Sequence, residues 1–168
     1  MENLFLSLEK EVFRGNVLDI TYNGQGIIYL VNKYYDNSIE IDYLDNDIDK
    51  IVNNTKGYYD SCVMFFSLRK YKTNFTRKRF LKKIHSMMSD DGYLYIWDIK
   101  KDLFKTWTKN IKVVLPDKTI TELKINEINL LEENSPEKVI NSIEDYFNVI
   151  ESVNSKDYFK IVAKRKGV

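Results

Sequence analysis

The sequence predicts an α/β domain with a mostly parallel sheet, and three observations support this class. A short apolar run, Val17–Ile20, leads through a turn with two glycines into a helical pattern over 26–34, which is the order strand, turn, helix. Residues 61–68 are apolar without alternation, as in a strand buried on both faces of a parallel sheet. Two β-rich segments, 148–153 and 158–163, flank a short turn, so they should pair in antiparallel fashion.

The bulk composition fits one globular domain over residues 1–168. Hydrophobic residues make up 43% of the chain and aromatic residues 14%, which is enough for a substantial core. The formal net charge of +1 creates no global field that would attract nucleic acid or a membrane. Cys62 is the only cysteine, and no apolar run approaches the roughly 20 residues that cross a bilayer. We expect a cytoplasmic protein without membrane association, and we predict no metal site.

The N-terminal segment has the spacing of a helix. Leu4, Leu8 and Val12 recur every four residues, so we expect an amphipathic helix over Glu2–Phe13. Gly15 suits the position just after the end of this helix.

Between residues 38 and 99, strands and helices should alternate. Apolar runs are separated by polar or glycine-containing turns, and the helical candidates carry apolar residues on one face. The expected elements are a strand over 38–43, a helix over 44–52, a strand over 61–68, a basic connection and helix over 69–88, and a strand over 93–99.

The last third of the chain changes character. Segments 112–115 and 119–125 can pair as a hairpin around a Pro-Asp-Lys turn, and we interpret about residues 111–126 as an insertion. Ser135-Pro136 is a typical helix start, with serine as the N-cap and proline at the first helical position. The antiparallel strand pair then closes the chain.

The glycine turn after the first strand suits a ligand. Gly24 and Gly26 carry no Cβ, so the backbone can approach a bound molecule closely, and the next helix presents free N–H groups and its positive dipole end. Asp42 follows Asp19 by roughly 20 residues, the interval at which a βαβ unit brings an acid to a ribose. Plain turn glycines and a helix-capping acid are the alternative interpretation. Tyr29 stands where a dinucleotide site needs a third glycine, which disfavours a nicotinamide cofactor.

Four motifs follow one another along the chain. They are V-L-D-I then G-Q-G at 17–26, I-E-I-D-Y at 39–43, Y-Y-D-S-C-V-M-F-F-S-L at 58–68 and D-D-G-Y-L-Y-I-W-D at 90–98. Together with the C-terminal strand pair, they resemble the class I S-adenosylmethionine-dependent methyltransferase family, and the resemblance covers residues 17–164.

The resemblance implies a three-layer Rossmann-like methyltransferase fold, with S-adenosylmethionine as methyl donor and S-adenosylhomocysteine as product. The family's third strand should be missing, because 17 residues separate Asp42 from Asp60. The first turn departs from the family, since Thr21 stands where a glycine usually follows the strand. The residues that the resemblance assigns to cofactor binding are Asp19, Tyr22, Asn23, Gly24, Gly26, Asp42, Tyr43 and Phe65.

The implied reaction is methyl transfer to an unidentified acceptor. Such a displacement mainly requires alignment and desolvation, with a general base for some acceptors. Asp98 is the candidate base, because it lies at the carboxyl end of a central strand; a solvated strand-end acid is the alternative interpretation. We interpret His85 as a surface residue. Methyltransferases that act on the amino groups of bases carry an Asn-Pro-Pro-Tyr type motif, and this chain has Phe65–Leu68 in its place. The absence of that motif argues against methylation of DNA amino groups.

Two other functions stay open. A non-catalytic, methyltransferase-shaped binding or interaction domain fits the irregular first turn. RNA binding would use a run of basic residues that is interleaved with aromatic ones, although most such runs are solvated helix faces. The basic run comprises Arg69, Lys70, Lys72, Arg77, Lys78, Arg79, Lys82 and Lys83. The oligomeric state is not predicted.

Overall fold

The fold is known from a computed structural model. The structure describes residues 1–21, 26–36, 38, 40–44 and 55–167, so the expected helix over 44–52 falls almost entirely outside the described residues. Along the chain the elements are β1 (Glu2–Ser7), β2 (Val17–Thr21), α1 (Ile27–Tyr35), β3 (Ile41–Tyr43), β4 (Tyr59–Phe65), the 3-10 turn η1 (Leu68–Lys70), α3 (Asn74–Met87), β5 (Met88–Ile99), β6 (Trp107–Val114), β7 (Ile120–Glu127), α4 (Pro136–Ile143), β8 (Phe147–Asn154) and β9 (Tyr158–Arg165).

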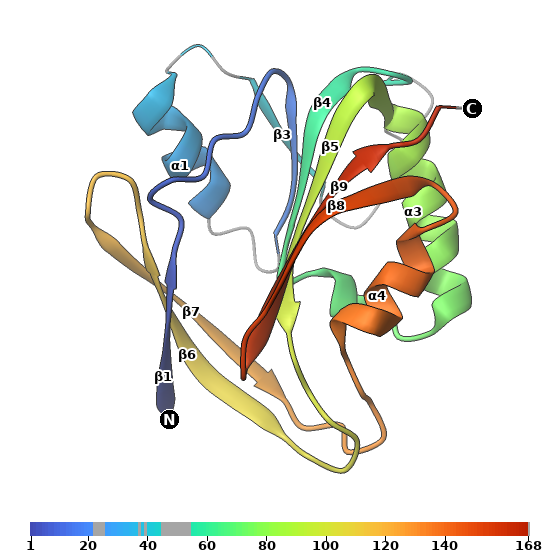
Figure 1. Cartoon of the computed structure of the whole chain (residues 1–168). Helices are drawn as coiled ribbons and strands as arrows, with labels where there is room; N and C mark the ends of the chain where they lie inside the picture. Colours follow the sequence, from blue (N-terminus) through green and yellow to red (C-terminus); the bar gives the residue numbers. More distant parts are fainter. Residues whose placement is uncertain (22–25, 37, 39, 45–54, 168) are drawn as a thin grey trace.

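The central sheet has the strand order β3-β2-β4-β5-β9-β8 within the described residues (Figure 1). Strands β3, β2, β4 and β5 pair in parallel, whereas β9 runs antiparallel to both β5 and β8. This mixed α/β architecture confirms the predicted class. The expected loss of the family's third strand concerns residues 45–54, which the structure does not describe.

Each face of the central sheet carries its own buried core. Because side chains alternate along a strand, Cys62 and Met64 of β4 join one core, and Val63 and Phe65 join the other. Helices α3 and α4 cover the first face, and α1 lies on the second (Figure 1). Burial on both sides explains why this segment of the sequence shows no polar alternation.

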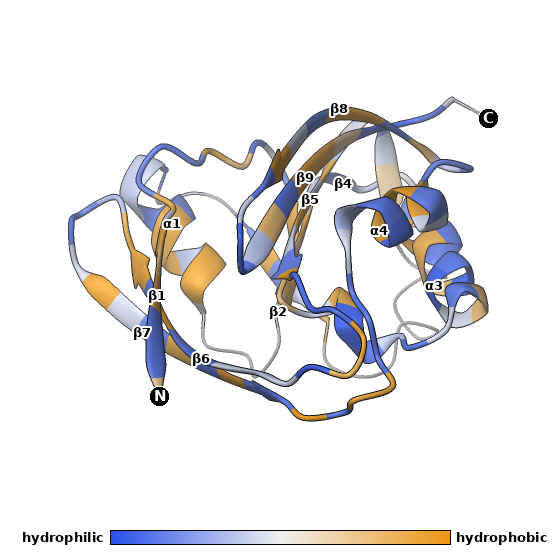
Figure 2. Cartoon of the chain, turned by 60° about the horizontal axis from the view of Figure 1, so that its bottom comes forward, coloured by the Kyte–Doolittle hydropathy of each residue, from blue (hydrophilic) through white to orange (hydrophobic). Residues whose placement is uncertain are grey.

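A second sheet, β1-β6-β7, lies on the same side as α1 (Figure 2). The hairpin expected around the Pro-Asp-Lys turn forms, with Val114 of β6 opposite Ile120 of β7. Buried residues of the hairpin, including Ile111 and Leu123, pack in the same core as Val31 of α1. Within the described residues, the central sheet is therefore covered by two helices on one face and by a helix and a small sheet on the other.

The helix expected over Glu2–Phe13 is wrong, because its first half is strand β1. β1 runs parallel to β6, with Leu4 opposite Ile111 and Leu6 opposite Val113. Leu4, Leu6 and Leu8 recur every second residue and turn toward the core, whereas Val12 is 50% exposed. The pairing partner lies about a hundred residues further along the chain, and it decides between the two periodicities.

Helices α3 and α4 both begin at side-chain caps. Thr73 accepts a hydrogen bond from the Thr76 N–H at 3.1 Å, and Ser135 accepts one from the Lys138 N–H at 3.3 Å. The cap at Ser135, with Pro136 in the first turn, confirms the predicted helix start. No helix in the described part of the chain is long and apolar enough to cross a membrane.

Candidate functional site

The candidate site lies at the carboxyl ends of β2, β3 and β4. The chain leaves β2 through α1 to β3 on one side, while β4 lies on the other side of β2, so the strand order reverses here. Ligands of open α/β sheets bind outside the carboxyl ends of the strands at such a point. The register sets Asp19 of β2 beside Tyr43 of β3 and Val63 of β4. The predicted residues Tyr22, Asn23 and Gly24 lie outside the described residues.

Asp19 is a buried acid with an incomplete set of hydrogen bonds. Its side chain is 1% exposed, and its Oδ1 accepts a hydrogen bond from the Thr21 hydroxyl. Its Oδ2 is buried without a hydrogen-bond partner among the described residues. Burial raises the pKa of this carboxyl to about 6, and the bonds from Thr21 only partly oppose that rise. A buried carboxylate oxygen of this kind is suited to a donor group that arrives with a ligand.

Tyr43 lies beside Asp19 at the same edge. Its side chain is 46% exposed, and partial burial, with the negative charge of Asp19, raises the pKa of its phenol. The Tyr43 hydroxyl therefore stays neutral at physiological pH and can donate a hydrogen bond. Its backbone neighbour Leu44 donates its N–H to the Asp19 carbonyl at 3.1 Å, which ties the end of β3 to β2.

The start of α1 faces this edge without a side-chain cap. Gly26, the N-cap residue, has a left-handed backbone with φ 64°, and no side chain caps the helix. A Cβ at this position would meet no described atom within 4 Å, but the positive φ itself favours glycine. The first turn contains no acidic residue. Its N–H groups and the positive end of the dipole are thus suited to an anionic group.

At the end of β4, a buried aromatic side chain is followed by a residue with a strained backbone. Phe65 is 0% exposed and packs against Phe66 and Trp97, so its side chain supports the site from within the core. Phe66 has a φ of 54°, which is unusual for an aromatic residue and often marks functional segments. The Oγ of the next residue, Ser67, is buried without a partner in the described chain. Ser67 is not among the site residues predicted from the sequence.

Asp42 is exposed, and its carboxylate is held by a tyrosine. The Tyr59 hydroxyl, at the start of β4, donates a hydrogen bond of 2.7 Å to Asp42 Oδ2. Burial and this acceptor raise the pKa of Tyr59, so the phenol remains a donor. One oxygen of Asp42 is thus engaged, and the ribose contact stays a prediction for the other.

Asp98 is fully buried, which overturns its interpretation as a solvated acid. Its carboxylate accepts the backbone N–H of Arg69 at 3.0 Å and that of Ile99 at 2.8 Å. Burial raises its pKa to about 6, and the positive charges of Arg69 and Arg77 lower it. Asp98 ties η1 to the end of β5, and it reaches no solvent. A role as general base stays a prediction.

The basic run of residues 69–83 is partly neutralised. Arg77 is only 6% exposed, and at least three of the other residues pair with described acids outside the run. The pairs are Arg69–Glu127 at 3.2 Å, Lys72–Glu132 at 2.8 Å and Lys78–Asp145 at 2.7 Å.

His85 is partly buried rather than on the surface, because its ring lies against Tyr146 and its Nε2 contacts the Lys166 carbonyl at 2.9 Å.

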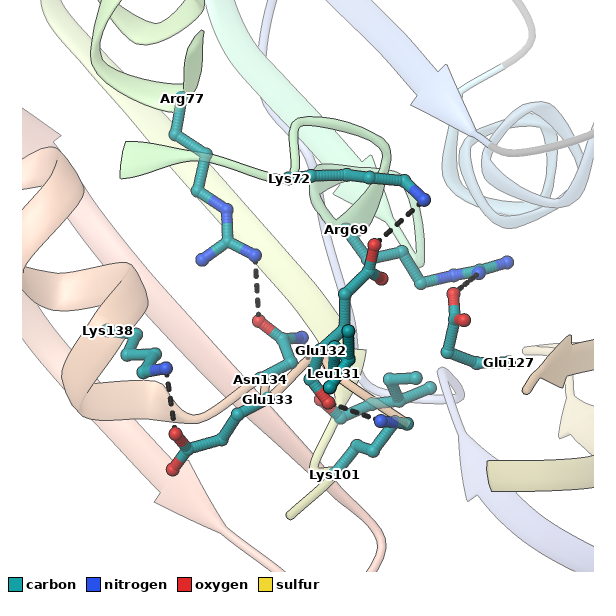
Figure 3. A pocket seen from close by; sticks show the side chains of 11 residues that line it. Arg69, Lys72, Arg77, Lys101, Glu127, Leu131, Glu132, Glu133, Asn134 and Lys138 are labelled. Atoms are coloured by element: carbon teal, nitrogen blue, oxygen red, sulfur yellow. Dashed lines mark hydrogen bonds and ion pairs between the residues drawn. The ribbon is translucent and has the colours of Figure 1, made fainter. Parts of the chain in front are cut away.

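A cavity of about 120 Å³ opens near the ends of β4 and β5 (Figure 3). It lies between η1, the segment after β5 and the loop before α4, and it brings together Arg77, Lys101 and Asn134. Lys101 and Asn134 exchange two backbone hydrogen bonds, of 2.9 and 2.8 Å, which join the two segments. No feature of the sequence pointed to Lys101 or Asn134, because they come together only in the folded chain.

Neither a model of a known protein family nor any curated protein matches the sequence. Solved structures do share the fold. A SAM-dependent methyltransferase from Aquifex aeolicus is similar with a TM-score of 0.59 and 16% identity, over 93% of this chain and 85% of that one. The 1,6-didemethyltoxoflavin-N1-methyltransferase of Burkholderia thailandensis, solved with S-adenosylhomocysteine, has a TM-score of 0.58 and 12% identity, over 92% and 72%.

The glycopeptide N-methyltransferase MtfA, also complexed with S-adenosylhomocysteine, has a TM-score of 0.55 and 12% identity, over 92% of this chain and 84% of that one. At these identities the likeness concerns the fold. The chain therefore has a fold that is shared with S-adenosylmethionine-dependent methyltransferases, in agreement with the motif resemblance.

Proposed function

We propose that the chain binds S-adenosylmethionine at the carboxyl end of β2 and transfers its methyl group to an acceptor. The observation that carries the proposal is Asp19 Oδ2, a buried carboxylate oxygen without a partner among the described residues, at the strand-order reversal of this fold. The donor molecule carries an ammonium group and hydroxyl groups, each of which can donate a hydrogen bond to that oxygen. It carries no phosphate, so the absence of a third glycine at Tyr29 is no obstacle.

Different residues at the carboxyl ends of these strands suit differently charged groups of the donor molecule. Asp19 and the Tyr43 hydroxyl lie on adjacent strands and suit the polar hydrogens of the donor. The uncapped N-terminus of α1, beginning at Gly26, suits its carboxylate. Asp42 would accept the ribose hydroxyls through the carboxylate oxygen that Tyr59 does not occupy.

Methyl transfer asks for alignment more than for acid–base chemistry. S-adenosylmethionine supplies a methyl group on a sulfonium, which is already an activated leaving group. The protein contributes a fixed orientation and a site that excludes water. The buried aromatic residues Phe65, Phe66 and Trp97 give the floor of the site the rigidity that alignment requires.

Isothermal titration with S-adenosylhomocysteine tests the proposal. The wild-type protein should bind, and Asp19→Asn should bind about tenfold more weakly or worse, because a charge-assisted hydrogen bond is worth about 1.5–3 kcal/mol. Asp91→Asn is the matched control, since Asp91 is exposed and pairs with Lys164; its affinity should equal that of the wild type. Absence of binding by the wild-type protein refutes the function, and equal binding by Asp19→Asn refutes the role of Asp19.

A non-catalytic binding domain is the second candidate, and the engagement of Asp42 by Tyr59 favours it. In that case one acid of the donor site serves the fold rather than the ligand. Thermal unfolding with S-adenosylmethionine tests whether the donor binds, because a ligand that binds only the native state raises the melting temperature. A rise identifies a donor-binding protein, and no rise with a large excess of the donor leaves an interaction domain that does not use it.

A further inference from the structure

Two of the most buried cations of the described chain line the same cavity. Arg77 is 6% exposed and Lys101 is 3% exposed, and both border the cavity between η1 and the loop before α4. No ion pair joins either of them to a described carboxylate. Lys109 makes the contrast clear: it is 8% exposed, and it pairs with Glu2 at 2.7 Å and Asp157 at 2.9 Å. Buried charges are normally paired in this way.

The hydrogen bonds of both cations go to neutral oxygens. The Arg77 Nε donates to the Tyr71 carbonyl at 2.7 Å, and its Nη2 donates to the Asn134 Oδ1 at 3.2 Å. Lys101 Nζ donates to the carbonyls of Asn129, at 2.7 Å, and Glu132. Figure 3 shows the Arg77 guanidinium directed toward Asn134. These contacts fix the positions of the two cations without balancing their charges.

The acids around the cavity do not supply the missing charge. Those that line it are each engaged by another cation. The buried Asp98 is a single negative charge, and the cations that act on it are Arg77 and the already paired Arg69. Arg77 and Lys101 together thus exceed the charge of Asp98 by one. The engaged pairs are Arg69–Glu127 at 3.2 Å, Lys72–Glu132 at 2.8 Å and Lys138–Glu133 at 2.8 Å.

We propose that this cavity binds a carboxylate or phosphate group carried by the methyl acceptor, an assignment that rests on the proposed function. An anion between Arg77 and Lys101 balances the excess charge in a site from which water is partly excluded. The cavity volume of about 120 Å³ corresponds to about four water molecules at roughly 30 Å³ each, which suits such a group. Only Ser67 and Leu68 separate Phe66, at the end of β4, from Arg69 on the cavity wall, so the two sites share one edge of the sheet.

One of the residues that line the cavity is an exposed apolar one. Leu131 is 76% exposed among charged lining residues, and its chain neighbour Leu130 and Phe104 are 48% and 68% exposed. The N–H of Phe104 donates to the Leu130 carbonyl at 2.7 Å, so the two loops that carry these side chains are joined. An exposed leucine on the wall of a pocket with two buried cations suits an acceptor with an anionic group and an apolar body.

Nuclear magnetic resonance titrations of the wild-type protein with acetate, benzoate and inorganic phosphate, at constant ionic strength, test this inference. We expect saturable shifts of backbone amides near Arg69, Lys101 and Asn134. Benzoate should bind severalfold more tightly than acetate, because its ring can contact Leu131. Shifts that are scattered over surface lysines, or that do not saturate for any of the three anions, overturn the inference.

Variants locate the anion. Lys101→Met should weaken binding about tenfold or more, since one charge-assisted contact is lost, and Arg77→Lys, which keeps the charge but loses the planar fork, should weaken it less. Arg79→Gln is the control, because Arg79 is an exposed residue of the same helix; its affinity should not change. Unchanged affinity in both Lys101→Met and Arg77→Lys overturns the inference.

The inference and the proposed function can fail separately. S-adenosylhomocysteine is titrated into the same protein in a second series. Binding of the donor product without binding of any anion refutes the acceptor site alone. Binding of an anion without binding of S-adenosylhomocysteine supports the anion site and refutes the methyl-transfer function, and with it the assignment of the anion to an acceptor.

Discussion

Replacement of Asp19 by asparagine should remove a loss of stability that the wild-type protein shows as the pH rises. Burial raises the pKa of Asp19 from 3.8 to about 6, so the folded protein holds its proton more tightly than the unfolded chain does. Stability then falls as the pH rises from about 4 to about 6 and stays level above that window. A shift of about two pKa units corresponds to about 3 kcal/mol. Relative to wild type, Asp19→Asn should gain about 2–3 kcal/mol between about pH 4 and pH 8.

Urea denaturation over this pH range, followed by tryptophan fluorescence, measures the difference. Any pH-independent cost of the new amide cancels, because only the change with pH is used. Asp91→Asn is the control with the opposite sign: Lys164 lowers the pKa of Asp91, so this acid contributes stability that is lost as the pH falls through its folded pKa. A free-energy difference for Asp19→Asn that does not change with pH refutes the reasoning. The folded chain would then balance the negative charge of Asp19, and its pKa would not be raised.

Three further substitutions test the packing of the fold by urea or thermal unfolding. Gly15→Ala should cost about 2 kcal/mol or more, because Gly15 has a φ of +66° and a Cβ there would lie 2.0 Å from Asp60 Oδ2; wild-type stability would show that this loop yields. Phe13→Ala should cost about 3–5 kcal/mol, since the ring is 1% exposed in the core beneath β1, and a loss below about 1 kcal/mol would contradict that packing. Lys109→Met should cost about 1–3 kcal/mol by leaving the partly buried Asp157 without its cation, whereas no loss would mean that the pair contributes nothing.

The central strands could be predicted because their signal is local. β4 is buried on both faces, so its apolar run has no polar alternation. The start of α4 could be predicted for the same reason, because Ser135 and Pro136 act within one turn of the helix. β1 could not be predicted in this way. Leu4, Leu6 and Leu8 fit a strand, whereas Leu4, Leu8 and Val12 fit a helix, and the decision comes from the remote partner β6.

The candidate site at the carboxyl ends of β2, β3 and β4 could be predicted only in part, for a similar reason. The position of Asp19 beside the turn follows from the order of strand, turn and helix, which is a property of contiguous sequence. The burial of Asp98 depends on η1, whose Arg69 N–H it accepts across 29 positions of sequence. The cavity with Arg77 and Lys101 needs three separate segments to meet, and charged residues in a sequence do not reveal whether they will be paired. The exposed basic patch that the sequence indicated is therefore partly a set of buried or paired cations.

A crystal structure of the protein grown with S-adenosylhomocysteine tests the proposed donor site most directly. The ligand should lie between the carboxyl ends of β2 and β4, with a donor group about 2.7–3.2 Å from Asp19 Oδ2 and its carboxylate at the N-terminus of α1. A ligand bound elsewhere, or a site that stays empty in excess ligand while Asp19 bonds to residues of its own chain, would refute donor binding at Asp19.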